Sequence, residues 1–367
     1  MTLCLAVSPG RHPRAIHRFE PRWASLCLLI ALVPPGAASA EDLTERLRAE
    51  ADRTRTTLLA LPSSPIVDGE RARVRGMLDD VDGLLKAGRI SIAIETLSST
   101  VPGTAGFARA STGWDDTGQG SGKHIDALTK EREGIGPNLQ SERARFPSSL
   151  PKGQSAFIRA MAEQSLGQVD EHYAVAVDYA RVSGVSAGAY YLGRAEGHMA
   201  WALTLSRLNS SSLRPVVAIP TLSTPLDRLE EEIVSAYAKP GSTAQHANFI
   251  LANSSLKLAK ELEQHGLRFG ALVTMLRGLF ALCLATTGQP TAAEAKALTA
   301  EADGFAARFA ASKHDETIGE AFLEKARIAL EKSEAGGEAG DRERVRAAGL
   351  LRGVLPRYVE IMEGLSR

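Results

Sequence analysis

The 367-residue chain contains little cysteine, few aromatic side chains and no excess of charge of either sign. It has 43 Lys and Arg against 43 Asp and Glu, without a long basic block, which argues against a nucleic-acid-binding surface. Hydrophobic residues make up 44% and charged residues 23%, a balance that excludes wholesale disorder. The length allows roughly one to three domains and is ample for a buried core.

The first 40 residues have the layout of a secretory signal peptide. Four arginines between positions 11 and 22 form a positive region, residues 24–33 are apolar, and Ala-Ser-Ala stands at 38–40. The apolar run is too short to cross a membrane as a helix, which needs about 20 residues. We therefore expect cleavage after Ala40, a periplasmic or secreted protein, and no integral membrane span. The alternative is an uncleaved N-terminal anchor.

Removal of residues 1–40 would leave a mildly acidic protein with one thiol. The segment contains four arginines and one acidic residue, so 39 basic and 42 acidic residues remain. Cys4 and Cys27 are lost with it, and a lone Cys283 cannot form an intramolecular disulfide. Its apolar neighbours favour an inert core thiol. The fold must therefore depend on packing.

Beyond residue 41 the apolar residues recur at intervals of three and four, which is the helical period. We predict a first helix that stops at Pro62, a second closed by Gly88, and a third that ends before Pro102. The later predicted helices are 124–145, 153–182, 185–208, 225–238, 243–265, 267–287, 291–311 and 315–333, followed by a helical stretch interrupted at Pro356. The fold class is all-α, with antiparallel hairpins stacked as an irregular α-α repeat or a helical bundle.

The expected organisation has four parts. A signal peptide (1–40) precedes an N-terminal hairpin region (41–102), a Gly/Ser-rich flexible linker with a polar helix (103–151) and a main all-helical domain (152–367). Within the last part, residues 185–208 contain three interior glycines. Each costs roughly 1 kcal/mol relative to alanine, so we expect this helix to approach a neighbour closely.

Two hairpins share a spaced set of small and aliphatic residues around a glycine turn. These residues are Leu258, Ala259, Leu262, Gly266 and Ala271 in one hairpin and Val81, Gly88 and Ala93 in the other. The pattern resembles the tetratricopeptide-type repeat, which implies stacked helical hairpins with a concave protein-binding surface. The spacing departs from that family, because Gly266 and Gly288 are 22 residues apart and the family repeats about every 34.

The best candidate binding surface lies on the glycine-rich helix. Tyr191, Arg194, His198 and Trp201 recur at helical spacing and so fall along one side of it. Tyr, Trp and Arg commonly anchor binding surfaces. The interpretation that we favour for the two aromatic residues is that they belong to the core, with Arg194 and His198 at its edge.

Three residues of the preceding helix, His172, Tyr173 and Tyr179, are candidates for the same surface. No spacing typical of a zinc, haem or di-iron site occurs, and no serine-hydrolase motif is present, so we assign no catalytic residue, metal or cofactor. The acidic row Glu316, Glu320 and Glu324 is expected to be a solvated helix face.

These observations predict an exported helical scaffold without catalytic activity that binds another protein or a peptide in the cell envelope. The alternative is a bundle that binds a small ligand or a metal, or an enzyme of unfamiliar type. That alternative places a pocket between helices near His172 and His198.

Overall fold

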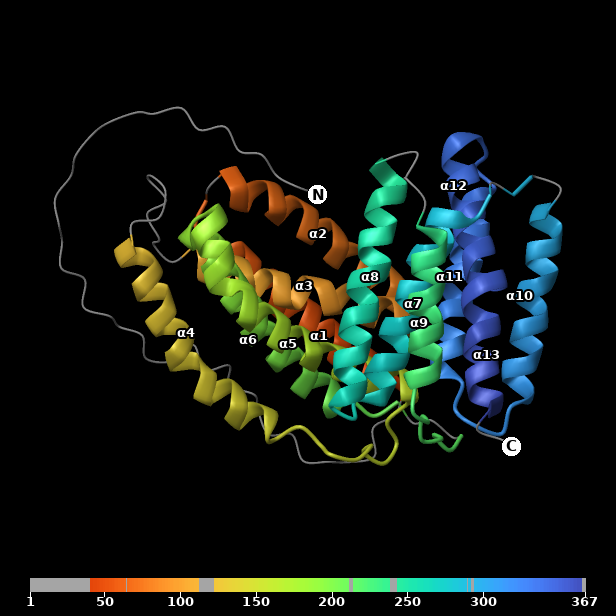
Figure 1. The fold of residues 1–367 in the computed structure, drawn as a ribbon, viewed down its shortest axis with the longest axis horizontal. Helices are drawn as coiled ribbons and strands as arrows, with labels where there is room; N and C mark the ends of the chain where they lie inside the picture. Colours follow the sequence, from red (N-terminus) through yellow and green to blue (C-terminus); the bar gives the residue numbers. More distant parts are fainter. Residues whose placement is uncertain are drawn as a thin grey trace. The chain divides into compact units, whose positions relative to one another are not determined.

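The computed structural model describes residues 40–63, 65–111, 122–210, 214–237, 243–288, 290–291 and 294–364. They all belong to one compact unit, Ala37–Arg367. The predicted signal segment before Ala40 lies outside the described residues. The all-α prediction is confirmed, because no strand occurs in the described ranges (Figure 1).

Helices follow one another along the chain with short connections. Their bounds are α1 Ala40–Ala60, α2 Pro65–Lys86, α3 Ile90–Ala110, α4 Gly122–Arg143, α5 Ala156–Ser183, α6 Val185–Ser206, α7 Ser223–Ala236, α8 Thr243–Gln264, α9 Arg268–Thr286, α10 Glu294–Ala311, α11 Thr317–Ser333, α12 Gly337–Ala348, a π-helical segment η1 Gly349–Val354, and α13 Leu355–Gly364. Successive helices pack as hairpins, most extensively α5 with α6 and α8 with α9. The stacked-hairpin prediction is therefore confirmed.

Two of these hairpins use the same glycine turn. Gly88 and Gly266 both have a φ of 72°, a left-handed conformation that glycine adopts without a Cβ clash. Arg89, which follows the first glycine, donates its backbone N–H to the carbonyl of Leu84 at 2.8 Å. The corresponding bond after Gly266 measures 2.9 Å. The predicted helix end at Gly88 is thus confirmed.

The glycines of α6 allow α3 to lie directly against it. A Cβ placed on Gly193 would come within 2.6 Å of the carbonyl oxygen of Ala105, and one on Gly197 within 2.7 Å of the Cα of Pro102. Such distances are too short for any side chain, so only glycine fits at this crossing. The expectation of a close helix neighbour is confirmed: Gly193 and Gly197 approach α3, and Gly188 approaches the carbonyl of Ala176 on α5.

Helix α3 is longer than predicted. Instead of ending before Pro102, it continues to Ala110, so the first eight residues of the predicted linker are helical. A proline inside a helix costs about 3 kcal/mol. Here Pro102, Ala105 and Gly106 of α3 lie directly against Gly193 and Gly197 of α6. The packing offsets the cost of the proline.

The predicted interruption at Pro356 is also wrong. The chain runs through α12, η1 and α13 without leaving a helical conformation. Pro356 is the second residue of α13, and one residue separates it from the end of the π-helical segment at Val354. A π turn shifts the backbone hydrogen-bond register by one residue, which accommodates a proline that cannot donate a hydrogen bond.

The most apolar helix, α9, runs through the core. It is the one described helix long and apolar enough to cross a membrane, with a mean hydropathy of 1.8 over 18 residues, and 67% of that window is buried. It packs against α5 and α8. Its N-terminus is capped by the carboxylate of Glu163, which accepts a 2.9 Å hydrogen bond from the backbone N–H of Gly270 and pairs with buried Arg159 at 2.5 Å.

Candidate functional site

A groove of about 930 Å³ lies between the N-terminal hairpin and the C-terminal helices. One wall comes from α1 and the α2–α3 turn, the other from α10 and α11, and the beginning of α5 lies between them. The apolar lining is formed by Leu43, Ile90, Ile94, Phe157, Ile158, Phe309, Leu323 and Ile328. A volume of this size can hold a drug-sized molecule or a short stretch of extended peptide.

The charged residues of the groove are matched in sign. Its lining includes the arginines Arg89, Arg214 and Arg327 and the acids Glu320, Glu324 and Glu331. Arg89 Nη2 lies 2.8 Å from the Glu331 carboxylate, which joins the α2–α3 turn to α11 across the groove. Arg214 and Glu320 form a second pair at 2.6 Å. The rim therefore presents no strong charge of either sign.

Helix α5 begins inside the groove. Ser155 caps its N-terminus by accepting a 3.3 Å hydrogen bond from the backbone N–H of Ile158. The backbone N–H of Phe157, also in the first turn of α5, donates to the hydroxyl of Thr317 at 3.1 Å. This bond ties the start of α5 to the start of α11 and fixes two sides of the groove relative to each other.

The acidic row on α11 contributes to this region, contrary to prediction. Each of the three carboxylates is half-buried and contacts a residue from another element. The contacts are Glu316 with the Tyr358 hydroxyl at 2.8 Å, Glu320 with Arg214 at 2.6 Å, and Glu324 with the Ser91 hydroxyl. The row is therefore not a solvated face, because each carboxylate is half-buried against a residue of another element.

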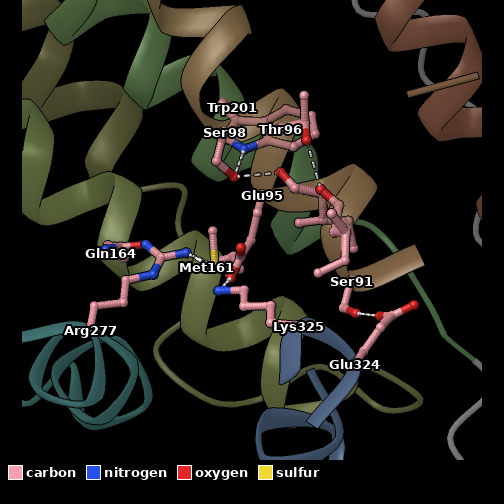
Figure 2. Close-up of polar contacts among 12 residues, drawn as sticks. Ser91, Glu95, Thr96, Ser98, Met161, Gln164, Trp201, Arg277, Glu324 and Lys325 are labelled. Carbon is pink, nitrogen blue, oxygen red and sulfur yellow. Dashed lines mark hydrogen bonds and ion pairs between the residues drawn. The ribbon is translucent and has the colours of Figure 1, made fainter. Parts of the chain in front are cut away.

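A polar network connects both walls of the groove to the centre of the molecule. Figure 2 shows the Glu95 carboxylate of α3 between Lys325 of α11 and Arg277 of α9. The same oxygen of Glu95 lies 2.6 Å from Lys325 Nζ and 3.0 Å from Arg277 Nη2. Arg277 also contacts Gln164 and the sulfur of Met161, both on α5.

The network perturbs both acid and base. Burial alone would raise the pKa of Glu95, but the charges of Lys325 and Arg277 outweigh it and lower that pKa. Burial also lowers the pKa of Lys325, against the opposing effect of Glu95. The Glu95 carboxylate and the Lys325 amine hold each other in place through their 2.6 Å contact. Sequence reasoning missed this network because Glu95 belongs to no motif.

The structure brings five of the candidate binding residues into one cluster. His172 of α5 and His198 of α6 are both buried, with ring centroids 5.1 Å apart, and the ring of Tyr191 lies 5.5 Å from that of His172. Tyr191 also stacks on Tyr179, at 4.1 Å between centroids. Arg194 lies close enough to influence the charge of both imidazoles.

Both imidazoles are held in the neutral form. Burial, with the charge of Arg194, lowers the pKa of His172 to about 3. Burial lowers the pKa of His198 well below its ordinary value, and His172 and Arg194 add to the effect. None of the four ring nitrogens has a hydrogen-bond partner among the described residues.

The other two predicted residues lie outside this cluster. Trp201 is fully buried, and its indole N–H donates to the hydroxyl of Ser98 at 2.8 Å, as Figure 2 shows. The hydroxyl of Tyr173 donates to the carbonyl of Arg132 on α4 at 3.0 Å, and the guanidinium of Arg132 lies 4.5 Å from the centre of the Tyr173 ring. Trp201 therefore links α6 to α3, and Tyr173 links α5 to α4. Their role in binding stays a prediction.

Within the described ranges, no group of three or more His, Cys, Asp or Glu could hold a metal ion. Cys283 is half-buried, and burial raises the pKa of its thiol to about 11. The thiol is thus protonated at neutral pH.

Comparison with known proteins adds no identity. No family model, curated protein or solved structure matches the chain.

Proposed function

We propose that the chain is an exported helical scaffold that holds an extended segment of another protein in the groove between α1–α3 and α10–α11. One observation carries this proposal. The groove has a volume of about 930 Å³ and an apolar lining, and it is built from helices more than 200 residues apart in the sequence. Stacked helical hairpins commonly use such surfaces to bind proteins.

The rim supports a peptide as the occupant. Three arginines and three glutamates line the groove, so neither a polyanion nor a polycation would be favoured by charge alone. Apolar side chains of an extended segment could rest on Ile90 and Ile328, which are partly exposed, while its backbone groups face the polar rim. A nucleic acid would require a basic patch, which this rim does not provide.

Site-specific photo-crosslinking in cells tests the proposal. A photoreactive side chain at Ala87 or Ala310, which lie on opposite walls of the groove, should give the same crosslinked partner. Ile250 on α8, 54% exposed and outside the groove, is the control position. The proposal predicts an adduct at both groove positions and none at Ile250.

An adduct at neither groove position, or the same adduct at all three positions, would contradict groove binding. The crosslinking is done in whole cells, so that export is preserved. N-terminal sequencing of the same material checks the proposed export, because cleavage after Ala40 leaves Glu41 as the first residue.

A further inference from the structure

Arg194 carries a charge that nothing in the described part of the chain neutralises. Its Nε is buried without a hydrogen-bond partner, and its guanidinium lies 5.8 Å from the centre of the Tyr190 ring. The nearby Glu196 is engaged elsewhere, because it pairs with Arg109 of α3. Charged side chains are rarely buried without a partner, and Arg194 forms no ion pair within the described ranges.

Beside this arginine stand two imidazoles in the same condition. His172 is 6% exposed and His198 is 4% exposed, and both nitrogens of each ring lack partners among the described residues. A buried polar group without a hydrogen bond costs about 1–3 kcal/mol. Neutral imidazole can donate one N–H, so the pair offers two further donors next to the guanidinium.

Among the described residues, no carboxylate contributes to the pKa shifts in this cluster. The groups that shift the pKa values of His172, His198 and Tyr191 are burial, Arg194, the other histidine and the tyrosines Tyr179 and Tyr190. With both imidazoles neutral, the cluster has a net charge of +1. Two of its members reach the solvent, because Tyr179 is 41% exposed and Arg194 is half-buried.

We propose that Arg194, His172 and His198 bind the carboxylate of a small monoanionic molecule. A guanidinium donates two parallel hydrogen bonds to a carboxylate. The ring N–H groups would donate to the remaining lone pairs of the carboxylate oxygens. The stacked rings of Tyr179 and Tyr191 provide an apolar surface for the rest of the ligand. One cation matches one negative charge, which favours a monocarboxylate over a phosphate dianion.

A metal ion fits this cluster poorly, because two imidazoles are its only ligands of the usual kinds and a cation stands beside them. The carboxylate site is also separate from the groove proposed above, since none of its residues lines that groove. Either proposal can therefore fail without the other.

Titration of the full-length chain with acetate, benzoate and inorganic phosphate tests the site. Binding is followed by calorimetry and by the NMR signals of the histidine ring protons. We expect saturable binding of acetate and tighter binding of benzoate, with shifts in the His172 and His198 signals. Arg194→Gln and His198→Gln should each weaken benzoate binding at least tenfold. Arg181→Gln, at an arginine of α5 that is 62% exposed and pairs with Asp178, should leave it unchanged.

Three results would overturn the proposal. The first is no saturable binding of either carboxylate at tens of millimolar, as expected if ordered water satisfies the ring nitrogens. The second is unaltered binding in both Arg194→Gln and His198→Gln. The third is phosphate binding more tightly than benzoate, because that would show that the site prefers a dianion. Circular dichroism of each variant confirms that the comparison is made on folded protein.

Discussion

At the scale of single residues, the two buried histidines couple stability to pH. In the folded chain both pKa values lie below the ordinary value of 6.5, that of His172 at about 3. The unfolded chain therefore binds more protons than the folded chain between these limits. Stability from the neutral imidazoles is complete above about pH 6.5 and is lost as the pH falls towards 3.

We expect the free energy of unfolding to fall by roughly 2 kcal/mol between pH 7 and pH 5 from His172, with a further loss from His198. Replacing the rings with apolar side chains, in His172→Phe and His198→Leu, should remove this part of the pH dependence. Urea unfolding at the two pH values measures it. His265→Gln, at an exposed position, is the control and should keep the original dependence. An equally steep loss in the double variant would show that other groups are responsible.

Residue types and spacing predicted part of this cluster but not all of it. The positions of Tyr191, Arg194 and His198 follow from helical periodicity, and His172 was added from the preceding helix. Trp201 shares the spacing but points into the core, where its N–H meets Ser98. Periodicity places residues on a side of a helix, and only tertiary packing decides what covers that side.

At the scale of helices, the crossing of α3 and α6 shows which information the sequence carries. Three glycines in one predicted helix indicated a close neighbour, but not which one. The partner, α3, was predicted to stop at Pro102. Local helix propensity includes the cost of a proline, but it does not include the packing energy from contacts with residues nearly 100 positions away. Only the three-dimensional structure identifies the contact, in which Pro102 lies against Gly197.

Alanine substitutions test this crossing directly. Gly193→Ala should destabilise the protein by about 1–3 kcal/mol, because the new methyl group would meet the backbone of α3. Gly76→Ala in exposed α2 is the matched control, since nothing lies within 4 Å of a Cβ there. That change should stabilise by up to about 1 kcal/mol through helix propensity. Thermal unfolding compares the two; a stabilised Gly193→Ala variant would contradict the close approach.

At the scale of the whole molecule, the Glu95 network connects helices that are remote in sequence. Glu95 and Lys325 are 230 residues apart, and Arg277 is 182 residues from Glu95. No periodicity in a single sequence reports such a contact, so the network could not be predicted. Because α3 and α11 also form opposite walls of the groove, the ion pair between them fixes the width of the groove.

Replacing this carboxylate should therefore affect both stability and binding. Glu95→Gln leaves Lys325 and Arg277 partly buried beside each other without an anion. We expect a loss of about 2–3 kcal/mol, below the range for fully buried pairs because the side chains are 17–28% exposed.

Glu331→Gln is the control, because it breaks a rim pair with Arg89 in which the glutamate side chain is 58% exposed, and it should cost less than about 1 kcal/mol. Urea unfolding measures both variants. If Glu95 also fixes the groove, crosslinking from Ala87 and Ala310 should weaken in Glu95→Gln under conditions where the protein remains folded. Unchanged stability in Glu95→Gln would contradict this prediction. It would mean that apolar packing alone holds the walls of the groove together.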